Sequence, residues 1–244
     1  MQNELLVHAE NLSFQYGKTP ILEGINLKVE KGQFVGIIGP NGGGKTTLLK
    51  LILGFLKPTK GSIKVLGESP KAARKKMSYV PQALHRDKEF PISVIDVVLG
   101  GKLSEYSWFS GYSKDAITQA YSLLERLELK DLAHSPFGNL SGGQAQKTLI
   151  ARALISEPEI LLLDEPTSSV DAKSEKEIHE ILRSLQGQMS ILMVTHDIRA
   201  IIDNTKNILS VHRKVVTMKP ADVCEHFALG VYHTPLIQNS NSET

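Results

Sequence analysis

Hydrophobic and polar residues alternate in the first part of the chain, in short stretches such as Leu5–Ala9 and Ile25–Val29. The turn-forming segments Tyr16-Gly17-Lys18 and Lys31-Gly32 separate these stretches. A period of two residues is typical of half-buried strands, and glycine marks the turns between them. Residues 5–35 therefore predict a small antiparallel β subdomain.

Continuous apolar runs, each followed by a helical pattern, form a second theme. Phe34–Ile38 precedes a glycine-rich turn and the helical pattern Thr46–Leu53. Ile160–Leu163 precedes a predicted helix over Lys173–Leu185, and the apolar run Ile191–Val194 follows it. Runs of this length are typical of strands buried on both faces. Alternating buried strands and helices predict a parallel α/β core.

Between these parts, residues 62–80 suggest further short strands, and roughly 83–155 carries helical periodicity. The periodicity is clearest in Ala116–Leu129 and Gly142–Leu154, so we expect a helical subdomain inserted into the core. The whole organisation predicts one domain over residues 1–237, followed by a polar, disordered tail over 238–244.

Composition adds limits rather than a function. The 244 residues are 41% hydrophobic and 22% charged, with a net charge of +2 from interspersed basic and acidic residues, which gives no indication of a nucleic-acid partner. The single cysteine, Cys224, has no internal disulfide partner, and the N-terminus does not resemble a secretory signal. We therefore expect a cytosolic chain. Its apolar runs are far shorter than the roughly 20 residues that span a bilayer, so any membrane crossing falls to another polypeptide.

The turn after Phe34–Ile38 matches the phosphate-binding pattern G-x-x-x-x-G-K-S/T. It reads Gly39-Pro40-Asn41-Gly42-Gly43-Gly44-Lys45-Thr46, and Thr47 extends it. Glycines let backbone N–H groups surround phosphate oxygens at a helix N-terminus. Lys45 is expected to reach the β- and γ-phosphates of ATP, and Thr46 to supply a Mg²⁺ ligand. The alternative is a chance glycine turn before a lysine, but the preceding strand and following helix favour the phosphate site.

Two adjacent carboxylates, Asp164 and Glu165, follow the buried run Leu161-Leu162-Leu163. Open α/β sheets bind ligands at this end of their strands. Asp164 is predicted to hold Mg²⁺, and Glu165 to orient or deprotonate the attacking water. The alternative is that the pair caps a helix at Pro166-Thr167.

A second anion-binding pattern opens the predicted helix that contains Ala151-Arg152-Ala153-Leu154. It reads Leu140-Ser141-Gly142-Gly143-Gln144, and here the chain resembles the ABC ATPases over roughly residues 5–235. The resemblance implies the ABC ATPase fold and hydrolysis of Mg-ATP. Ser141 and the N–H groups of Gly142 and Gly143 offer a second cradle for the γ-phosphate, beside Gln144. Two cradles with one Lys45 imply that each ATP lies between two copies of the chain.

The resemblance carries four further positions. Tyr16 matches the aromatic residue that stacks on adenine, although a lone tyrosine near a turn is more often simply packed. Gln82 matches the glutamine that contacts Mg²⁺ or water and links the site to the helical insertion; its alternative is a solvated loop residue. His196 matches the switch histidine that contacts the γ-phosphate; the alternative is a histidine with a purely structural role. Asp171, in Ser169-Val170-Asp171, matches a dimer contact, and it is also a potential N-cap.

Two positions depart from the family pattern. The family usually has a basic residue within two positions of Gln144, whereas this chain has Ala145-Gln146-Lys147. Lys147 either takes that role or the contact is missing. Gly42-Gly43-Gly44 has one glycine more than many members, which we expect to loosen the loop by less than about 1 kcal/mol.

The cargo is suggested by resemblance alone. The stretch Asp87–Gly100, Glu225-His226-Phe227 and Tyr232-His233 are similar to ATPases of bacterial zinc, manganese or iron importers. This implies integral-membrane permease subunits, a metal-binding protein outside the cell and a peripheral place on the cytoplasmic face of the cell membrane. Apolar aromatic residues could receive a permease helix or fill the core of the helical insertion, namely Phe90, Trp108, Phe109 and Tyr112.

A metal site in this chain itself is not indicated at the C-terminus. Cys224, His226 and His233 follow the spacing C-x-H-x6-H, which fits no common structural zinc pattern. The leading hypothesis is therefore an importer's ATPase subunit. A transporter ATPase for another substrate, a soluble ABC ATPase of DNA repair or translation, and an ATP-controlled interaction module are the alternatives. Glu165 and His196 oppose the last, and the missing coiled coil, second ATPase half and basic stripe oppose the soluble enzyme.

Overall fold

The computed structural model describes residues 4–82, 90–168, 170–197, 201–202, 205 and 207–223. Several expectations fall outside these residues: the start of the Asp87–Gly100 stretch, Ser169, the tail over 238–244, and the cysteine and histidines near the C-terminus, Cys224, His226 and His233.

The predicted antiparallel sheet is present. Its strands are β1 (Leu5–Tyr16), β2 (Thr19–Glu30) and β4 (Lys60–Val65), in the order β2-β1-β4. β1 pairs antiparallel with both neighbours. Alternating apolar residues of β1 and β2, such as Leu12 and Ile25, point into the core and are fully buried or nearly so.

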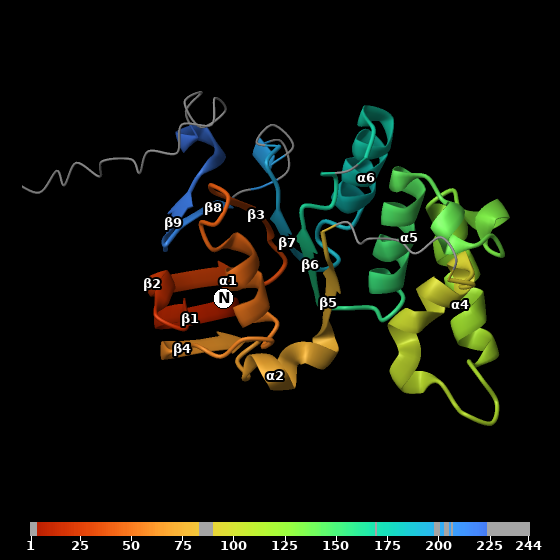
Figure 1. Ribbon diagram of the computed structural model, residues 1–244, viewed down its shortest axis with the longest axis horizontal. Coiled ribbons are helices and arrows are strands. Elements are labelled where there is room, and N and C mark those ends of the chain that lie inside the picture. The colour runs from red at the N-terminus through yellow and green to blue at the C-terminus, as the bar shows by residue number, and fades with distance from the viewer. Residues whose placement is uncertain are drawn as a thin grey trace, which may run out of the picture.

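A second sheet forms the centre of the molecule (Figure 1), with six strands in the order β5-β6-β7-β3-β8-β9. The strands are β3 (Phe34–Ile38), β5 (Met77–Val80), β6 (Ile160–Asp164), β7 (Ser190–Val194), β8 (Asn207–His212) and β9 (Lys214–Met218). All pairings are parallel except that of β9 with β8. The sequence analysis did not predict β8 and β9.

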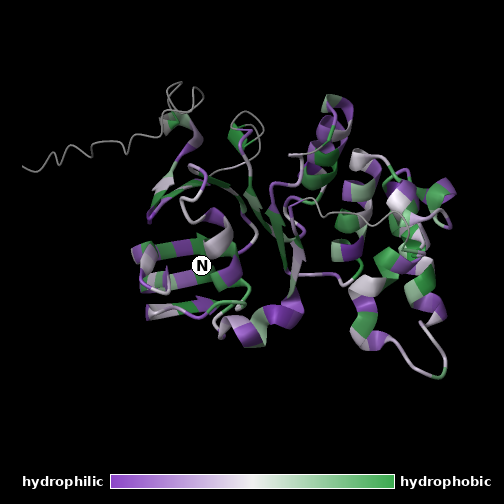
Figure 2. Ribbon diagram, viewed as in Figure 1, coloured by the Kyte–Doolittle hydropathy of each residue, from purple (hydrophilic) through white to green (hydrophobic). Residues whose placement is uncertain are grey.

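The apolar runs are continuous because both faces of the central sheet are covered. In β6, Ile160 and Leu162 pack into a core that also contains β1, β2 and helix α1 (Lys45–Ile52). Leu161 and Leu163, on the other face, pack with helices α5 (Gly142–Leu154) and α6 (Ala172–Ser184). The central strands are accordingly the greenest part of Figure 2, whereas α6 shows a hydrophilic side.

The remaining helical elements lie mainly between β5 and β6. They are α3 (Val94–Leu99), α4 (Lys114–Arg126) and the 3-10 turns η2 (Gly100–Glu105), η3 (Lys130–Leu132) and η4 (Phe137–Asn139). α3 and α4 share a third apolar core with α5. In Figure 1 this group lies on the opposite side of the central sheet from β1, β2 and β4.

One short segment contradicts the prediction of strands throughout 62–80. Residues 70–76 form helix α2 (Pro70–Ala73) and the 3-10 turn η1 (Arg74–Lys76). The side chain of Ser69 accepts a hydrogen bond from the N–H of Ala72, and Pro70 occupies the first turn. A serine N-cap followed by proline is a helix start signal, and it outweighs the neighbouring strand pattern.

The fold class is confirmed: a P-loop-type parallel α/β core, an N-terminal antiparallel sheet and an α-helical insertion. A last 3-10 turn, η5, covers Pro220–Asp222. Among the described residues, every helix is too short or too polar to cross a membrane.

Candidate nucleotide site

The glycine-rich loop joins β3 to α1, as predicted. Gly44 precedes the helix with a φ of 105°, in the region that favours glycine. A Cβ on Gly39 would lie 2.1 Å from the carbonyl oxygen of Val211 in β8, and one on Gly43 would lie 2.7 Å from the same oxygen. Gly43, in the run of three glycines, therefore lets the loop approach β8 closely.

Lys45 is buried inside this loop, with 6% of its surface exposed. Its Nζ donates to the carbonyl oxygens of Gly39 at 2.9 Å and Pro40 at 3.1 Å. Burial lowers the pKa of the Lys45 ammonium, while the carboxylates of Glu165 and Asp164 act in the opposite direction. The ammonium is held at the mouth of the loop by carbonyl groups that anionic oxygens can replace.

Asp164 ends β6 directly beside the loop and is only 3% exposed. The hydroxyl of Tyr79 in β5 donates to Asp164 Oδ2 at 3.3 Å, and the Thr46 side chain also forms a hydrogen bond with this carboxylate. Burial raises the pKa of Asp164, and burial together with the nearby carboxylate raises the pKa of Tyr79 to about 12. The carboxylate thus lies in a poorly solvated position, where a cation would be favoured.

Glu165, the next residue, is held from two sides. Gln82 Nε2 donates to Oε2 at 2.9 Å, and the Nε2–H of His196 donates to Oε1 at 2.7 Å. Its backbone has a φ of 49° and donates its N–H to the carbonyl of Val194 in β7. A non-glycine residue in this region is uncommon, and such positions cluster at functional sites. The chain forms a turn here, so the alternative of a helix at Pro166-Thr167 is wrong.

Part of these groups lines one cavity of about 450 Å³, whereas Asp164 is not among the lining residues and is joined to the site by its hydrogen bond with Thr46. The cavity is lined by loop and helix residues, by the predicted catalytic side chains and by one residue of β2: Asn41, Gly42, Gly44, Lys45, Thr46, Thr47, Gln82, Glu165, His196 and Ile21. Strands β3, β5, β6 and β7 place these side chains at the carboxyl ends of the parallel sheet, where such sheets bind ligands.

Sequence reasoning missed two members of the site. Ile21 lines the cavity from β2, and Tyr79 contacts Asp164. The only sequence signal for Tyr79 was its closeness to Gln82 in Tyr79-Val80-Pro81-Gln82. Tyr79 lies near the end of β5, and Gln82 lies in the loop that follows this strand.

The donor set fits Mg²⁺. Thr46, Gln82 and Asp164 offer a hydroxyl, an amide carbonyl and a carboxylate, all oxygen ligands of the kind that Mg²⁺ prefers. Asp164 is buried with its pKa raised, which indicates an anionic position that a bound cation would stabilise. The roles of these residues toward the metal remain predictions.

The second predicted cradle does not line this cavity. Ser141 caps α5: its Oγ accepts from the N–H of Gln144 at 3.2 Å, and Gln144 Oε1 accepts from the N–H of Ser141 at 2.9 Å. Gly142 starts the helix, and Gly143 is pressed against Ser174 of α6, where a Cβ would lie 2.0 Å from Ser174 Oγ. All of these residues are described, and none is among those that line the cavity.

Tyr16 also lies apart from the lining residues. Its ring is 48% exposed and packs edge-on against Phe14 at a centroid distance of 4.8 Å. The aromatic face is therefore accessible at the end of β1, and adenine stacking there remains a prediction.

Asp171 and Lys147 both have structural partners. Asp171 caps α6 by accepting from the N–H groups of Lys173 and Ser174, which confirms the N-cap interpretation and leaves the dimer contact as a prediction. Lys147 Nζ lies 3.0 Å from Glu177 Oε2, so it joins α5 to α6.

The aromatic residues of the helical insertion are not all core residues. Trp108 and Phe109 are 88% and 101% exposed, and Phe90 is also exposed. Tyr112 packs against Tyr106 with centroids 5.0 Å apart. A groove of about 390 Å³ between the core and the insertion is lined instead by residues such as Phe55, Tyr79 and Arg152. None of the four predicted aromatic residues lines this groove, and their contact with a permease helix stays a prediction.

Comparison with known proteins agrees with this geometry. The model of the ABC transporter family matches residues 22–168. A metal transport system ATP-binding protein of Chlamydia pneumoniae is 48% identical over 194 residues, which are 78% of this chain and 79% of the relative. The zinc uptake system ATP-binding protein ZurA of Listeria innocua is 39% identical, over 91% of this chain and 88% of that protein.

A solved structure supports the same assignment. An inward-facing transporter assigned to the metal-chelate ABC type superposes with a TM-score of 0.82 at 29% identity, over 94% of this chain and 89% of that one. The phosphate-binding loop, the Asp164-Glu165 strand end and the Ser141 segment thus occur together in a chain with the matching fold. The chain belongs to the ABC transporter family, as one of its ATPase cassettes.

Proposed function

We propose that this chain is the ATP-binding and ATP-hydrolysing subunit of an importer for a divalent metal ion, with zinc or manganese as the leading cargo and iron as the third. The observation that carries the catalytic part is the double hydrogen bonding of Glu165 by Gln82 and His196, at the rim of the Lys45 cavity. The relatives cited above are named as ATP-binding proteins of a metal transport system and a zinc uptake system, which supports the cargo.

ATP would enter with its phosphates over the glycine-rich loop. Lys45 Nζ, now bonded to the carbonyls of Gly39 and Pro40, would exchange these for β- and γ-phosphate oxygens, which are stronger acceptors. The N–H groups of Gly42 to Thr47 lie at the N-terminus of α1, whose positive dipole end favours the anion. Tyr16 would stack on the adenine.

Mg²⁺ held by Thr46, Asp164 and Gln82 would neutralise charge on the phosphates and align them. Glu165 would accept a proton from water while the water oxygen bonds to the γ-phosphorus and the bond to the ADP oxygen breaks. Each oxygen of Glu165 accepts one hydrogen bond at present, which leaves lone pairs for the proton of the attacking water. His196 would turn toward the γ-phosphate. Gln82 therefore connects the hydrolytic carboxylate to the strand end that leads into the helical insertion.

The Ser141 cradle is far enough from this cavity to contribute no lining residue, so we infer that a second copy of the chain supplies it. Each ATP would lie between the loop of one copy and Ser141 to Gln144 of the other, near Asp171. Loss of the γ-phosphate would remove the bridge between the copies, so the dimer would open after hydrolysis.

A transporter also needs a pathway through the membrane. Since no described helix can cross a bilayer, integral-membrane permease subunits would form the pathway, and an extracytoplasmic metal-binding protein would deliver the ion. The chain would sit peripherally on the cytoplasmic face of the cell membrane, without a nucleic-acid partner.

The test is uptake of radioactive zinc, manganese and iron into inverted or reconstituted vesicles that contain the chain with its co-purified permease. We expect ATP-dependent uptake of one metal, and loss of uptake with Lys45→Ala. The exposed Lys173→Ala is the matched control, since Lys173 is 88% exposed at its side chain. ATP hydrolysis without uptake of any of the three metals would refute the cargo, and no hydrolysis at all would refute the enzyme.

A further inference from the structure

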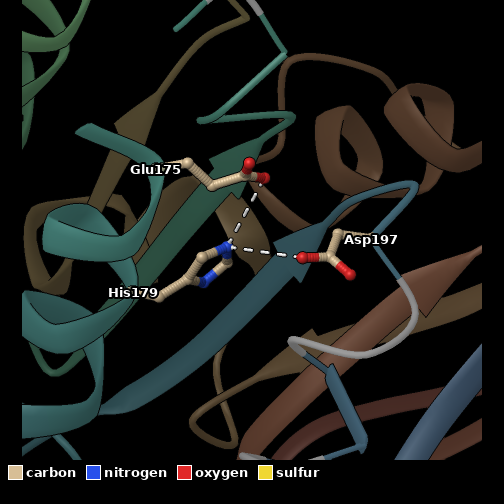
Figure 3. A group of neighbouring side chains, drawn as sticks. All are labelled: Glu175, His179 and Asp197. Carbon is tan, nitrogen blue, oxygen red and sulfur yellow. Dashed lines mark ion pairs between the residues drawn. The ribbon is translucent and has the colours of Figure 1, made fainter. Parts of the chain in front are cut away.

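A second cluster of metal-ligand side chains lies outside the nucleotide cavity. Glu175 and His179 are four residues apart on one side of α6, and Asp197 follows β7. Their side chains converge (Figure 3), so that one ligand atom from each lies within 4.8 Å of the others. None of the three lines the nucleotide cavity.

The three groups do not satisfy one another directly. His179 Nε2 lies 4.0 Å from Glu175 Oε1 and 3.9 Å from Asp197 Oδ2, and both distances exceed those of hydrogen bonds. Within the described part of the chain, this nitrogen is buried without a hydrogen-bond partner. Figure 3 marks both contacts as ion pairs, which applies to a protonated His179. With a neutral imidazole, a buried nitrogen that faces two carboxylate oxygens at this distance has the arrangement of a ligand set.

The state of the imidazole agrees with this arrangement. Burial lowers the pKa of His179, the two carboxylates oppose the shift, and the nearby Arg183 adds to it. The neutral form of histidine is the one that binds metals. In the neutral tautomer with its proton on Nδ1, the lone pair of Nε2 faces the gap between the carboxylates, where a metal ion can accept it.

The spacing suits a transition-metal ion of small radius. Zinc bonds to histidine nitrogen and carboxylate oxygen are about 2.0–2.2 Å long, so ligand atoms around a tetrahedral zinc lie roughly 3.3–3.5 Å apart. The distances of 3.9 and 4.0 Å from His179 Nε2 to the two carboxylates would need to shorten by about half an ångström. The two carboxylate oxygens lie within 4.8 Å of each other and would also move closer together. The Glu175 and Asp197 side chains are 36% and 35% exposed, so solvent reaches the site and water can supply a fourth ligand.

We infer that Glu175, His179 and Asp197 form a binding site for Zn²⁺. One imidazole and two carboxylates suit zinc better than magnesium or calcium, which take oxygen ligands alone. The two negative charges of the carboxylates match the charge of the ion. This site is independent of the transport cargo and of the nucleotide.

Its position gives the site a consequence for hydrolysis. Asp197 directly follows His196, whose Nε2 is bonded to Glu165. Zinc would tie this segment to α6 and restrain His196, so bound zinc would slow ATP hydrolysis. This second step rests on the proposed role of His196, whereas zinc binding itself does not.

The site is tested by equilibrium binding of Zn²⁺ to the full chain without nucleotide, in competition with a chromophoric chelator. Glu175→Gln and His179→Gln are expected to weaken one zinc site at least tenfold, because each removes a ligand. Matched controls are Glu180→Gln, on the exposed side of α6, and His8→Gln, which removes another histidine that lies beside a glutamate. Circular dichroism checks that each variant is folded.

A second background separates this site from the C-terminal residues. In Cys224→Ser/His226→Gln/His233→Gln, zinc binding should persist and should still depend on Glu175. Binding that is unaffected by Glu175→Gln and His179→Gln, or that disappears only in the C-terminal triple variant, would overturn the site. Zinc that slows hydrolysis equally in the wild type and Glu175→Gln would overturn the link to His196, while the binding result stands separately.

Discussion

Replacement of Glu165 by glutamine changes one oxygen to a nitrogen at the centre of the nucleotide site. The shape of the side chain is kept, but the group that accepts the proton of the attacking water is lost. Both carboxylate oxygens now accept hydrogen bonds, from Gln82 at 2.9 Å and from His196 at 2.7 Å. An amide can accept only one of them with its oxygen.

The two consequences differ in size. Loss of a general base typically costs about 10²- to 10⁴-fold in rate, or roughly 3–5 kcal/mol of transition-state stabilisation. The mismatched hydrogen bond costs about 1 kcal/mol of folding stability, and rotation of the amide or the other imidazole tautomer relieves part of it. Glu165→Gln should therefore fold and bind ATP, yet hydrolyse it at least a hundredfold more slowly.

The assay combines phosphate release, equilibrium binding of ATP and size-exclusion chromatography with and without ATP. The variant should bind ATP as the wild type does and accumulate as an ATP-bound dimer, because the bridging γ-phosphate persists. Glu180→Gln, which changes an exposed glutamate of α6, is the matched control and should be unaffected. Normal turnover by Glu165→Gln would remove Glu165 from its assigned role.

Three further changes test other parts of the structure. Lys45→Ala removes the charge-assisted contacts with phosphate and should weaken ATP binding about 10- to 100-fold in a direct binding assay; unchanged affinity would contradict the loop assignment. Gly143→Ala places a Cβ 2.0 Å from Ser174 Oγ and should lower the free energy of unfolding in urea by about 1–3 kcal/mol. The double variant Gly143→Ala/Ser174→Gly should recover part of this loss. Additive losses in the double variant would refute the contact. Hydrogen bonds, chiefly from Ser174, hold the pKa of Asp171 below its usual value, so its stabilising contribution is present above the unfolded pKa and is lost as pH falls through the folded one. Asp171→Ala should thus lower the urea midpoint at pH 7 by an amount that shrinks below pH 3.8. Asp171→Asn keeps the cap and should change the urea midpoint little. A difference in midpoint between the wild type and Asp171→Ala that stays constant across pH would contradict the cap.

Much of the fold was predictable because burial leaves a direct trace in the sequence. Ile160–Leu163 reads as one apolar run because alternate residues of β6 enter two different cores. Ser141 and Gln144 predict the start of α5 because they form a capping box, in which each side chain accepts a hydrogen bond from the backbone N–H of the other residue. Local hydrogen-bonding chemistry of this kind needs no knowledge of distant neighbours.

Contacts between distant elements were not predictable in the same way. The approach of Gly43 to Val211 depends on the position of β8, which follows more than 160 residues later. The cluster of Glu175 and His179 with Asp197 depends on the packing of α6 against the end of β7. Trp108 and Phe109 are apolar and so read as core residues in the sequence. The sequence pattern does not show that the turn that carries them is exposed.

The grouping of Lys45, Asp164 and Glu165 lies between these cases. Each motif was recognisable by itself, and parallel strands necessarily bring their carboxyl ends together. The two hydrogen bonds to the Glu165 carboxylate could not be predicted from the sequence. They depend on a turn in which Glu165 has a φ of 49° and on the residues that follow β5 and β7.

The central claim is that each ATP is bound by the glycine-rich loop of one copy and the Ser141 segment of another. The most direct measurement mixes two inactive variants, Lys45→Ala and Ser141→Arg, after each has been shown to fold, and follows ATP hydrolysis by the mixture. The account predicts that hydrolysis rises above the sum of the two separate activities, because a mixed dimer contains one intact shared site. A mixture that forms mixed dimers but stays inactive at every ratio, while wild-type subunits diluted with either variant retain activity, would contradict a shared site.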